Sequence, residues 1–538
     1  MDVSTNSWPS VYPQGFSSPL FTGDKADDPI RSTEYGEIRG THINVKNLDK
    51  GVNVFLGIPF ARPPIGALRF SPPQPPESWS EVKNATSYPP MCLQDITILE
   101  GLRKSLTINF SIPATSEDCL YLNIYVPDHA KEGARLPVMV WIHGGRFRFG
   151  SASMYDGSIL SAFQNIVVVT IQFRLGILGF FSTGDKHTSG NWGYLDQMAA
   201  QRWIQENIAH FGGDPGLVTI FDESIGGINA SLHILSPMSK GLLYRTIKER
   251  DGTIQPGLIS SRSESITRVI AHLSACEKYS SASLVECLRN KTEREIMAIS
   301  KYFKIIPGVI NGQFFPKHPE DLLASIKFHK VVSIINVNSN EYGSIIPLSL
   351  GITKFKELSR ENILQILLNP FMDIHPDNVD AMMYLYLWNF EDPKELQAQF
   401  QEMLGDFEIP ALRVAKYQQS PSSPVYFYAF QHGPTTFVSI KPDYVEVDYS
   451  DELFSVFGAF LHGPIAQEDK LFSWADIWSS RCWLVKPANS MTPFLPEPIW
   501  DPNDHLQLSV GQGMMAEKMK FWMKNLLQKK EAKDILGK

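Results

Sequence analysis

The stretch TIFDESIGG at residues 219–227 decides the fold class of this chain. The apolar run Val218–Phe221 predicts a buried strand, and the residues from Gly226 onward return to helical spacing. A serine at such a strand-to-helix turn matches the pattern G-x-S-x-G, which exposes a nucleophilic hydroxyl at the carboxyl edge of a sheet. The N-terminus of the following helix can stabilise a negatively charged oxygen there. Ser224 is therefore the candidate nucleophile.

A second motif lies upstream, where VWIHGG occupies residues 140–145. A strand followed by a glycine turn is the form of the loop that supplies backbone N–H donors to an oxyanion hole. We assign Gly144, Gly145 and Arg146 to this loop, and the N–H of Ile225 completes the predicted hole. The two motifs, in this order on consecutive elements of one sheet, favour an α/β-hydrolase.

Apolar runs elsewhere predict a doubly wound, mostly parallel central sheet flanked by helices. Runs of β-branched residues with few polar residues are expected where helices cover both faces of a sheet. Strands alternating with helices indicate an α/β fold. The predicted elements are strands at Leu120–Pro127, Leu136–His143, Ile166–Gln172, Val331–Val337 and Pro424–Phe430, antiparallel edge strands between Glu34 and Phe60, and a helix at Leu195–His210.

We expect one folded domain. Residues 1–28 are predicted to be a disordered or loosely attached leader, residues 29–528 a single α/β-hydrolase domain with helical insertions, and residues 529–538 a charged tail. The segment Gln255–Asp451 is predicted to be rich in helix, with recognisable strands only near the two runs named above. Met514–Gln528 predicts an amphipathic helix whose methionines pack in the core.

Composition excludes several kinds of partner. The chain of 538 residues is 43% hydrophobic and 20% charged, with a formal net charge of −8. Such a composition is typical of a soluble globular protein, and the negative charge argues against nucleic acid as a partner. Apolar runs are interrupted by Pro, Gly or charge before they could span a bilayer, which predicts no transmembrane segment. We expect no metal and no cofactor.

Cysteines and glycosylation sequons favour the secretory pathway. Two spaced pairs of cysteines and a fifth, Cys482, are more natural in an oxidising compartment. Sequons at Asn84, Asn109 and Asn290 lie in polar, loop-like stretches, whereas the sequon at Asn229 is expected to be buried. Neither a signal peptide nor an endoplasmic-reticulum retention signal is recognised in the chain, so a cytoplasmic location stays the alternative.

Further motifs give the chain a family resemblance. GIPFA at residues 57–61, SEDCLYLN at 116–123 and NWGYLDQ at 191–197 are similar to signatures of the type-B carboxylesterase and cholinesterase family. The resemblance covers nearly the whole chain from about Asp28. Within the family the chain looks most like the mammalian carboxylesterase 2 (cocaine-esterase type) branch, on MCLQD at residues 91–95, PGLI at 256–259 and QAQFQEM at 397–403.

The resemblance implies an activity and a set of site residues. It implies hydrolysis of small-molecule carboxylic esters and amides through an acyl-enzyme, in the endoplasmic reticulum lumen or after secretion. Ser224 matches the nucleophile, and Glu341, in NEYG at residues 340–343, matches the acid that orients the catalytic histidine. It also implies the disulfides Cys92–Cys119 and Cys276–Cys287.

The family's histidine is replaced in this chain. The motif that should read DHGDEL is DYSDEL at residues 448–453, which places Tyr449 at the position of the base. A tyrosine hydroxyl has a reference pKa of about 10 and is a poor base at neutral pH. Losing the histidine of a serine hydrolase can cost on the order of a million-fold in kcat.

Other departures lie close to Ser224 in sequence or motif. Asp222 replaces the first glycine of the nucleophile motif, Ile225 replaces a small residue, and Arg146 replaces a small residue of the oxyanion loop. Arg148 adds positive charge near the acyl pocket. A branched side chain at position 222 is expected to strain the turn.

Two functions are compatible with these motifs. The first is a strongly impaired carboxylic ester hydrolase. The second is a catalytically inactive family member that acts by binding a ligand or a protein. His462 or His432 could replace the missing base, and Arg146 could pair with Asp222, but loop positions with no catalytic role are the simpler interpretation for both histidines.

Overall fold

The structure is a computed structural model of the chain. It describes residues 28–45, 50–105, 112–223, 227–249, 258–261, 263–277, 280–303, 305–338, 359–368, 376–387, 390–393, 395–396, 399–400, 409–418, 420, 423–430 and 453. The following predicted features lie outside these residues: Ser224, Ile225, Glu341, Tyr449, Asn109, His432, His462, Cys482, nearly all of the leader, the helix at Met514–Gln528 and the tail at 529–538.

A nine-stranded sheet forms the centre of the described part of the chain, in the order β16-β15-β12-β11-β9-β10-β8-β4-β3. The strands from β16 to β10 run parallel to one another, and β8, β4 and β3 continue the sheet in antiparallel pairs. Their bounds are β3 (Thr41–Val45), β4 (Lys50–Pro59), β8 (Tyr121–Pro127), β9 (Leu136–Ile142), β10 (Val167–Ile171), β11 (Gly213–Glu223), β12 (Arg245–Glu249), β15 (Val332–Asn338) and β16 (Val425–Phe430).

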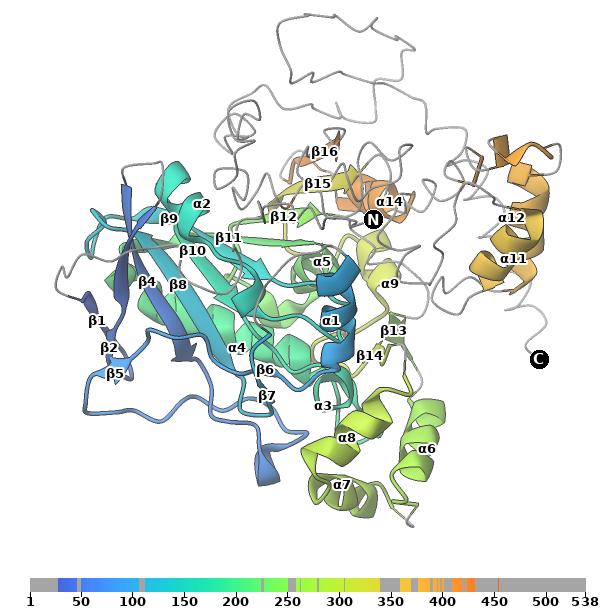
Figure 1. Cartoon of the computed structure of the whole chain (residues 1–538), viewed down its shortest axis with the longest axis horizontal. Coiled ribbons are helices and arrows are strands. Elements are labelled where there is room, and N and C mark those ends of the chain that lie inside the picture. The colour runs from blue at the N-terminus through green and yellow to red at the C-terminus, as the bar shows by residue number, and fades with distance from the viewer. Residues whose placement is uncertain are drawn as a thin grey trace, which may run out of the picture.

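Helices cover both faces of this sheet (Figure 1). One face packs against α4 (Trp192–Asn207) and α5 (Gly227–Leu235), which share a buried apolar cluster with β9, β10 and β11. The other face packs against α2 (Ser158–Gln164). Every residue of β10 is buried, so the side chains of this β-branched run pack against covering elements on both faces of the sheet. The predicted doubly wound α/β-hydrolase fold is confirmed.

The remaining elements surround the sheet or extend from it. They are β1 (Ile30–Thr33), β2 (Gly36–Arg39), β5 (Lys83–Asn84), β6 (Met91–Cys92), β7 (Thr115–Ser116), β13 (Ile259–Ser260), β14 (Gly308–Val309), α1 (Ile96–Ser105), α3 (Gly176–Phe180), α6 (Glu264–Leu273), α7 (Ser281–Arg289), α8 (Glu293–Ser300), α9 (Pro319–Ala324), α11 (Arg360–Leu368), α12 (Pro376–Leu387) and α14 (Ile409–Gln418), with short 3-10 turns at η1 (Gly66–Leu68), η2 (Ala152–Met154), η3 (Ile208–Phe211) and η5 (Pro237–Ser239).

Two details of the strand prediction need correction. The strand β12 was not predicted, because its sequence, RTIKE, carries three charged residues, yet it is a central strand with Thr246–Glu249 fully buried. Within the segment predicted to be rich in helix, β13 and β14 form an additional two-stranded parallel pair. Both pairings depend on partners far away in sequence, which local patterns do not record.

The helices α6, α7 and α8 form a lobe below the sheet (Figure 1). One guanidinium joins this lobe to the rest of the molecule. Arg69 makes a bidentate ion pair with Glu117 and also donates to the carbonyl oxygens of Leu288 (2.9 Å) and Lys291 (2.6 Å). Both side chains of the ion pair are less than a tenth exposed. Burial raises the pKa of Glu117, and the charge of Arg69 opposes that rise.

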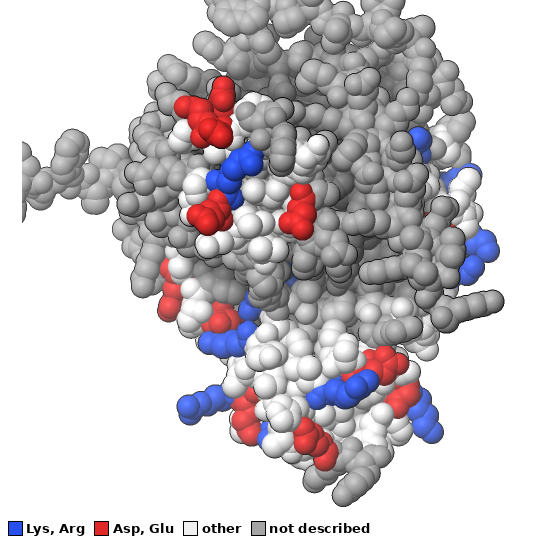
Figure 2. Space-filling model, turned by 90° about the vertical axis from the view of Figure 1, so that its right-hand side faces the viewer, with Lys and Arg blue, Asp and Glu red and all other residues white. Residues whose placement is uncertain are grey.

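The surface of this lobe mixes charges of both signs. Figure 2 shows Lys and Arg side chains lying among Asp and Glu side chains over the lobe, rather than gathered into one basic area. None of the helices in the described ranges is long and apolar enough to cross a membrane.

We expect Arg69→Met to lower the free energy of unfolding by about 3–5 kcal/mol, because it leaves the Glu117 carboxylate buried without its cation. The matched control is Arg62→Met, which removes an exposed ion pair with Glu77 (side chains 48% and 78% exposed) and should cost about 0–1 kcal/mol. Thermal unfolding at a fixed scan rate measures both. Equal, small effects would contradict the assigned role of Arg69.

Candidate active site

The topology brings the expected catalytic segments to one edge of the sheet. Because β9, β11, β12 and β15 are parallel, their carboxyl ends lie together, where ligands bind in open α/β sheets. Ile142, the last residue of β9, is in register with Asp222 of β11. The oxyanion loop thus begins beside the strand that leads into Ser224. The strand β15 ends at Asn338, shortly before Glu341 in the chain.

The oxyanion loop has a geometry that requires glycine. Gly145 has a φ of 98°, and a Cβ at that residue would lie 2.0 Å from the carbonyl oxygen of Phe149. Two hydrogen bonds close the turn that begins at Gly145. The backbone N–H groups of Arg148 (3.0 Å) and Phe149 (3.1 Å) both donate to the carbonyl oxygen of Gly145. Arg146 follows with a φ of 55°. The loop is a compact turn with backbone conformations that are rare for residues other than glycine.

A glutamine that sequence analysis did not assign holds the far end of this loop. Gln94 accepts a hydrogen bond from the N–H of Gly150 (2.9 Å) and donates back to its carbonyl oxygen (2.8 Å). Its amide also donates to the oxygen of Cys92 (2.9 Å). Cys92 is joined to Cys119 by a disulfide. The loop is therefore tied to the disulfide through one buried side chain.

His143, at the start of the loop, is a structural residue rather than a spare base. Its ring stacks on Phe173 with the ring centres 4.5 Å apart, and its Nδ1 lies 2.9 Å from the oxygen of Gly144. Burial lowers the pKa of His143 to about 4. A neutral, buried imidazole in this place supports the loop by packing.

Positive charge gathers on the outer part of the loop. Arg146 and Arg148 are both half-buried. Burial lowers the pKa of Arg148. The negative charge of Asp95 opposes this shift, and the positive charge of Arg146 lowers the pKa further. Asp95 in turn pairs with Lys301 (3.1 Å). Arg148 therefore lies near both Arg146 and Asp95, and its place near an acyl pocket stays a prediction.

Asp222 is accommodated inside β11 and faces helix α5. Its side chain is fully buried, and its Oδ2 accepts a hydrogen bond from the backbone N–H of Ala230 (2.7 Å), near the start of α5. A carboxylate near the N-terminus of a helix is stabilised by the helix dipole. Lys248, in register with Asp222 on β12, is also fully buried and donates to Gln418 Oε1 (2.6 Å).

Both predicted disulfides are confirmed, Cys92–Cys119 and Cys276–Cys287. The roles assigned to Ser224, Ile225, Glu341 and Tyr449 stay predictions, because these residues lie outside the described ranges. The oxyanion role of Gly144, Gly145 and Arg146 also stays a prediction. No group of three or more His, Cys, Asp or Glu side chains that could hold a metal ion occurs in the described part of the chain.

Comparisons with known proteins agree with this arrangement. The sequence profile of the carboxylesterase family matches residues 27–478. The chain is 48% identical to the acylcarnitine hydrolase of Mus musculus, over 96% of this chain and 94% of that protein. It is also 48% identical to the cocaine esterase of Homo sapiens, over 94% of this chain and 93% of that protein. A medium-chain fatty acyl-CoA hydrolase precursor of Anas platyrhynchos is 42% identical, over 95% of this chain and 94% of that protein.

We expect Gly145→Ala to destabilise the protein and to abolish labelling of Ser224 by a fluorophosphonate, because the added Cβ would displace the oxyanion loop. The control is Gly133→Ala, where φ is 82° but a Cβ would meet nothing within 4 Å. That control should cost about 1–2 kcal/mol from the left-handed backbone alone. Thermal unfolding and mass spectrometry after labelling measure the two effects. If Gly145→Ala behaves like the control, the loop is not held as described.

Proposed function

Because the chain belongs to the carboxylesterase family, we propose that it is a carboxylic ester hydrolase whose turnover is strongly reduced by Tyr449. The observation that supports this proposal most is the strand pairing at the carboxyl edge of the sheet. The oxyanion loop, with its required glycine, begins beside the end of β11 and hence beside the segment that holds Ser224. A scaffold for acyl transfer is therefore retained.

The proposed reaction follows from these positions. The Ser224 hydroxyl attacks the ester carbonyl, and the N–H groups of the oxyanion loop stabilise the negative oxygen that develops. The alcohol leaves, and water then releases the acid from the acyl-enzyme. Glu341 would orient a histidine, but Tyr449 offers neither a base near neutral pH nor an imidazolium for Glu341 to stabilise.

The proposed substrates are small-molecule carboxylic esters. This proposal is supported by the names of two relatives, acylcarnitine hydrolase and cocaine esterase. Tyr449 also favours the second candidate function, a family member that binds an ester-like ligand or a protein without turning it over.

We expect the wild-type chain to hydrolyse an activated aryl ester only slightly faster than Ser224→Ala. Tyr449→His should raise kcat by about 10²- to 10⁴-fold, the usual contribution of a positioned acid–base group. Steady-state assays of purified protein, with fluorophosphonate labelling in parallel, measure both.

The outcomes separate the two candidate functions. Turnover by the wild type well above that of Ser224→Ala would rule out the inactive binding protein. No gain from Tyr449→His, even combined with Asp222→Gly and Ile225→Ala, would show that the missing histidine is not what limits the site. Tyr449→Phe is the matched control, since it removes the hydroxyl without adding a base.

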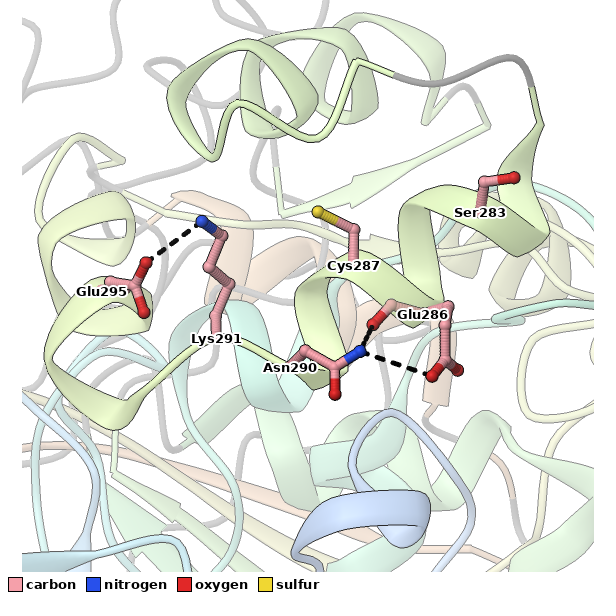
Figure 3. Close-up of a pocket in the computed structure, with 6 residues that line it drawn as sticks. All are labelled: Ser283, Glu286, Cys287, Asn290, Lys291 and Glu295. Carbon is pink, nitrogen blue, oxygen red and sulfur yellow. Dashed lines mark hydrogen bonds and ion pairs between the residues drawn. The ribbon is translucent and has the colours of Figure 1, made fainter.

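The proposed location is the endoplasmic reticulum lumen or the exterior of the cell. Two disulfides are more natural in an oxidising compartment. Asn84 in β5 and Asn290 at the end of α7 are exposed, whereas Asn229 in α5 is fully buried. Figure 3 shows Asn290 at a surface pocket beside Glu286, with its Nδ2 donating to the backbone oxygen of Glu286 (3.0 Å).

We expect N-glycans on Asn84 and Asn290 but not on Asn229 when the chain is made in animal cells. Asn84→Gln and Asn290→Gln should each reduce the mass by one glycan, and Asn229→Gln, the matched buried control, should leave the number of glycans unchanged. Intact-mass measurement before and after enzymatic removal of N-glycans gives the result. A protein that carries no glycan at all would favour the cytoplasmic alternative.

A further inference from the structure

Three polar side chains form a buried row where β11, β12 and β15 end. Glu223, Glu249 and Asn336 occupy matching positions in the parallel register. Residues in register on neighbouring strands project from the same face of a sheet. The three residues are 5%, 0% and 1% exposed, respectively. Two carboxyl groups therefore lie close together, out of contact with water, on the strand that leads directly into Ser224 and on its neighbour.

The carboxyl group of Glu249 is buried without a hydrogen-bond partner among the described residues. Neither of its carboxylate oxygens has a hydrogen-bond donor in the described part of the chain. An ionised carboxylate that is buried without donors takes up a proton instead of staying charged. Burial raises the pKa of Glu249 well above its usual range, and the charge of Glu223 raises it further.

Two tyrosines lie on the same side of the sheet as this row. Tyr155, which follows η2, packs its ring on Trp141 with the ring centres 4.8 Å apart. Burial raises the pKa of Tyr155, and Glu223 and Glu249 raise it further. Tyr426 of β16 packs against the same apolar cluster. Lys248 belongs to the opposite face of the sheet, because side chains alternate along a strand.

We propose that Glu249 holds a proton at neutral pH, so that the in-register residues Glu223 and Glu249 together carry no more than one negative charge. Its neutrality limits the negative charge buried at the end of the strand that leads into Ser224. That limit matters for any acyl transfer at Ser224, because a second buried negative charge would oppose the oxyanion. The proposal does not depend on turnover, so it can hold even if the chain is catalytically inactive.

Infrared spectroscopy of the full purified chain detects the proton directly. A protonated carboxylic acid has a carbonyl stretch that an ionised carboxylate lacks, and this band shifts in D₂O. We expect the band in the wild type at neutral pH and its loss in Glu249→Gln. The matched control is Glu264→Gln, which alters an exposed glutamate at the start of α6 and should leave the band unchanged. A wild type without the band at neutral pH would overturn the proposal, whether or not any variant folds.

The pH dependence of stability gives a second readout with a definite sign. The unfolded chain releases the proton of Glu249 above its ordinary pKa of about 4.3, whereas the folded chain retains it. Raising the pH therefore destabilises the wild type relative to Glu249→Gln, by up to about tenfold per pH unit in the unfolding equilibrium constant. We expect the melting temperature of Glu249→Gln to exceed that of the wild type at pH 7 and the two to converge near pH 4. A constant difference at all pH values would contradict a retained proton.

Discussion

The candidate site depends on the parallel pairing of β9 with β11. This pairing places Ile142 beside Asp222. The loops that follow β9 and β11 therefore begin next to each other, at the same edge of the sheet. An oxyanion loop from one strand and a nucleophile from the other can meet only with that register. The pairing is supported from both faces, because the strands alternate residues into two separate apolar clusters. A slip of one residue would reverse which side chains enter each cluster.

Sequence patterns predicted the parts of this framework that are locally encoded. The β-branched runs of β9 and β10 and the helix α4 were found close to where they were predicted. The two disulfides are also present, but their pairing was predicted from the family resemblance and not from a local pattern. The strand β12 was missed because its charged residues look solvent-exposed in sequence. It is nevertheless a central strand, because it pairs with β11 on one side and with β15 on the other. The role of Gln94 was missed for a similar reason, since its partner Gly150 is distant in sequence and no local pattern links them.

Asp222 and Tyr449 are two different kinds of departure from the family motifs. Asp222 looks disruptive in sequence, but its carboxylate is buried inside a regular strand and accepts a hydrogen bond from Ala230. Residue 222 is thus a regular, in-register position of β11. The predicted replacement of the catalytic histidine by Tyr449 is different in kind, because a phenol lacks the basicity of an imidazole near neutral pH. On the proposed function, the scaffold is maintained while the chemistry is weakened.

The predicted loss of the histidine would also change the effect of the nearby acidic residues on the reaction. In a serine hydrolase, an imidazolium forms as the oxyanion forms, and carboxylates near it are stabilising. Without that cation, each ionised carboxylate near Ser224 acts only against the negative oxygen. Two in-register glutamates, Glu223 and Glu249, would therefore be more harmful in this chain than in an intact triad. A proton held by Glu249 removes one of these two charges, which leaves the oxyanion less opposed and lowers the cost of burying the two carboxyl groups.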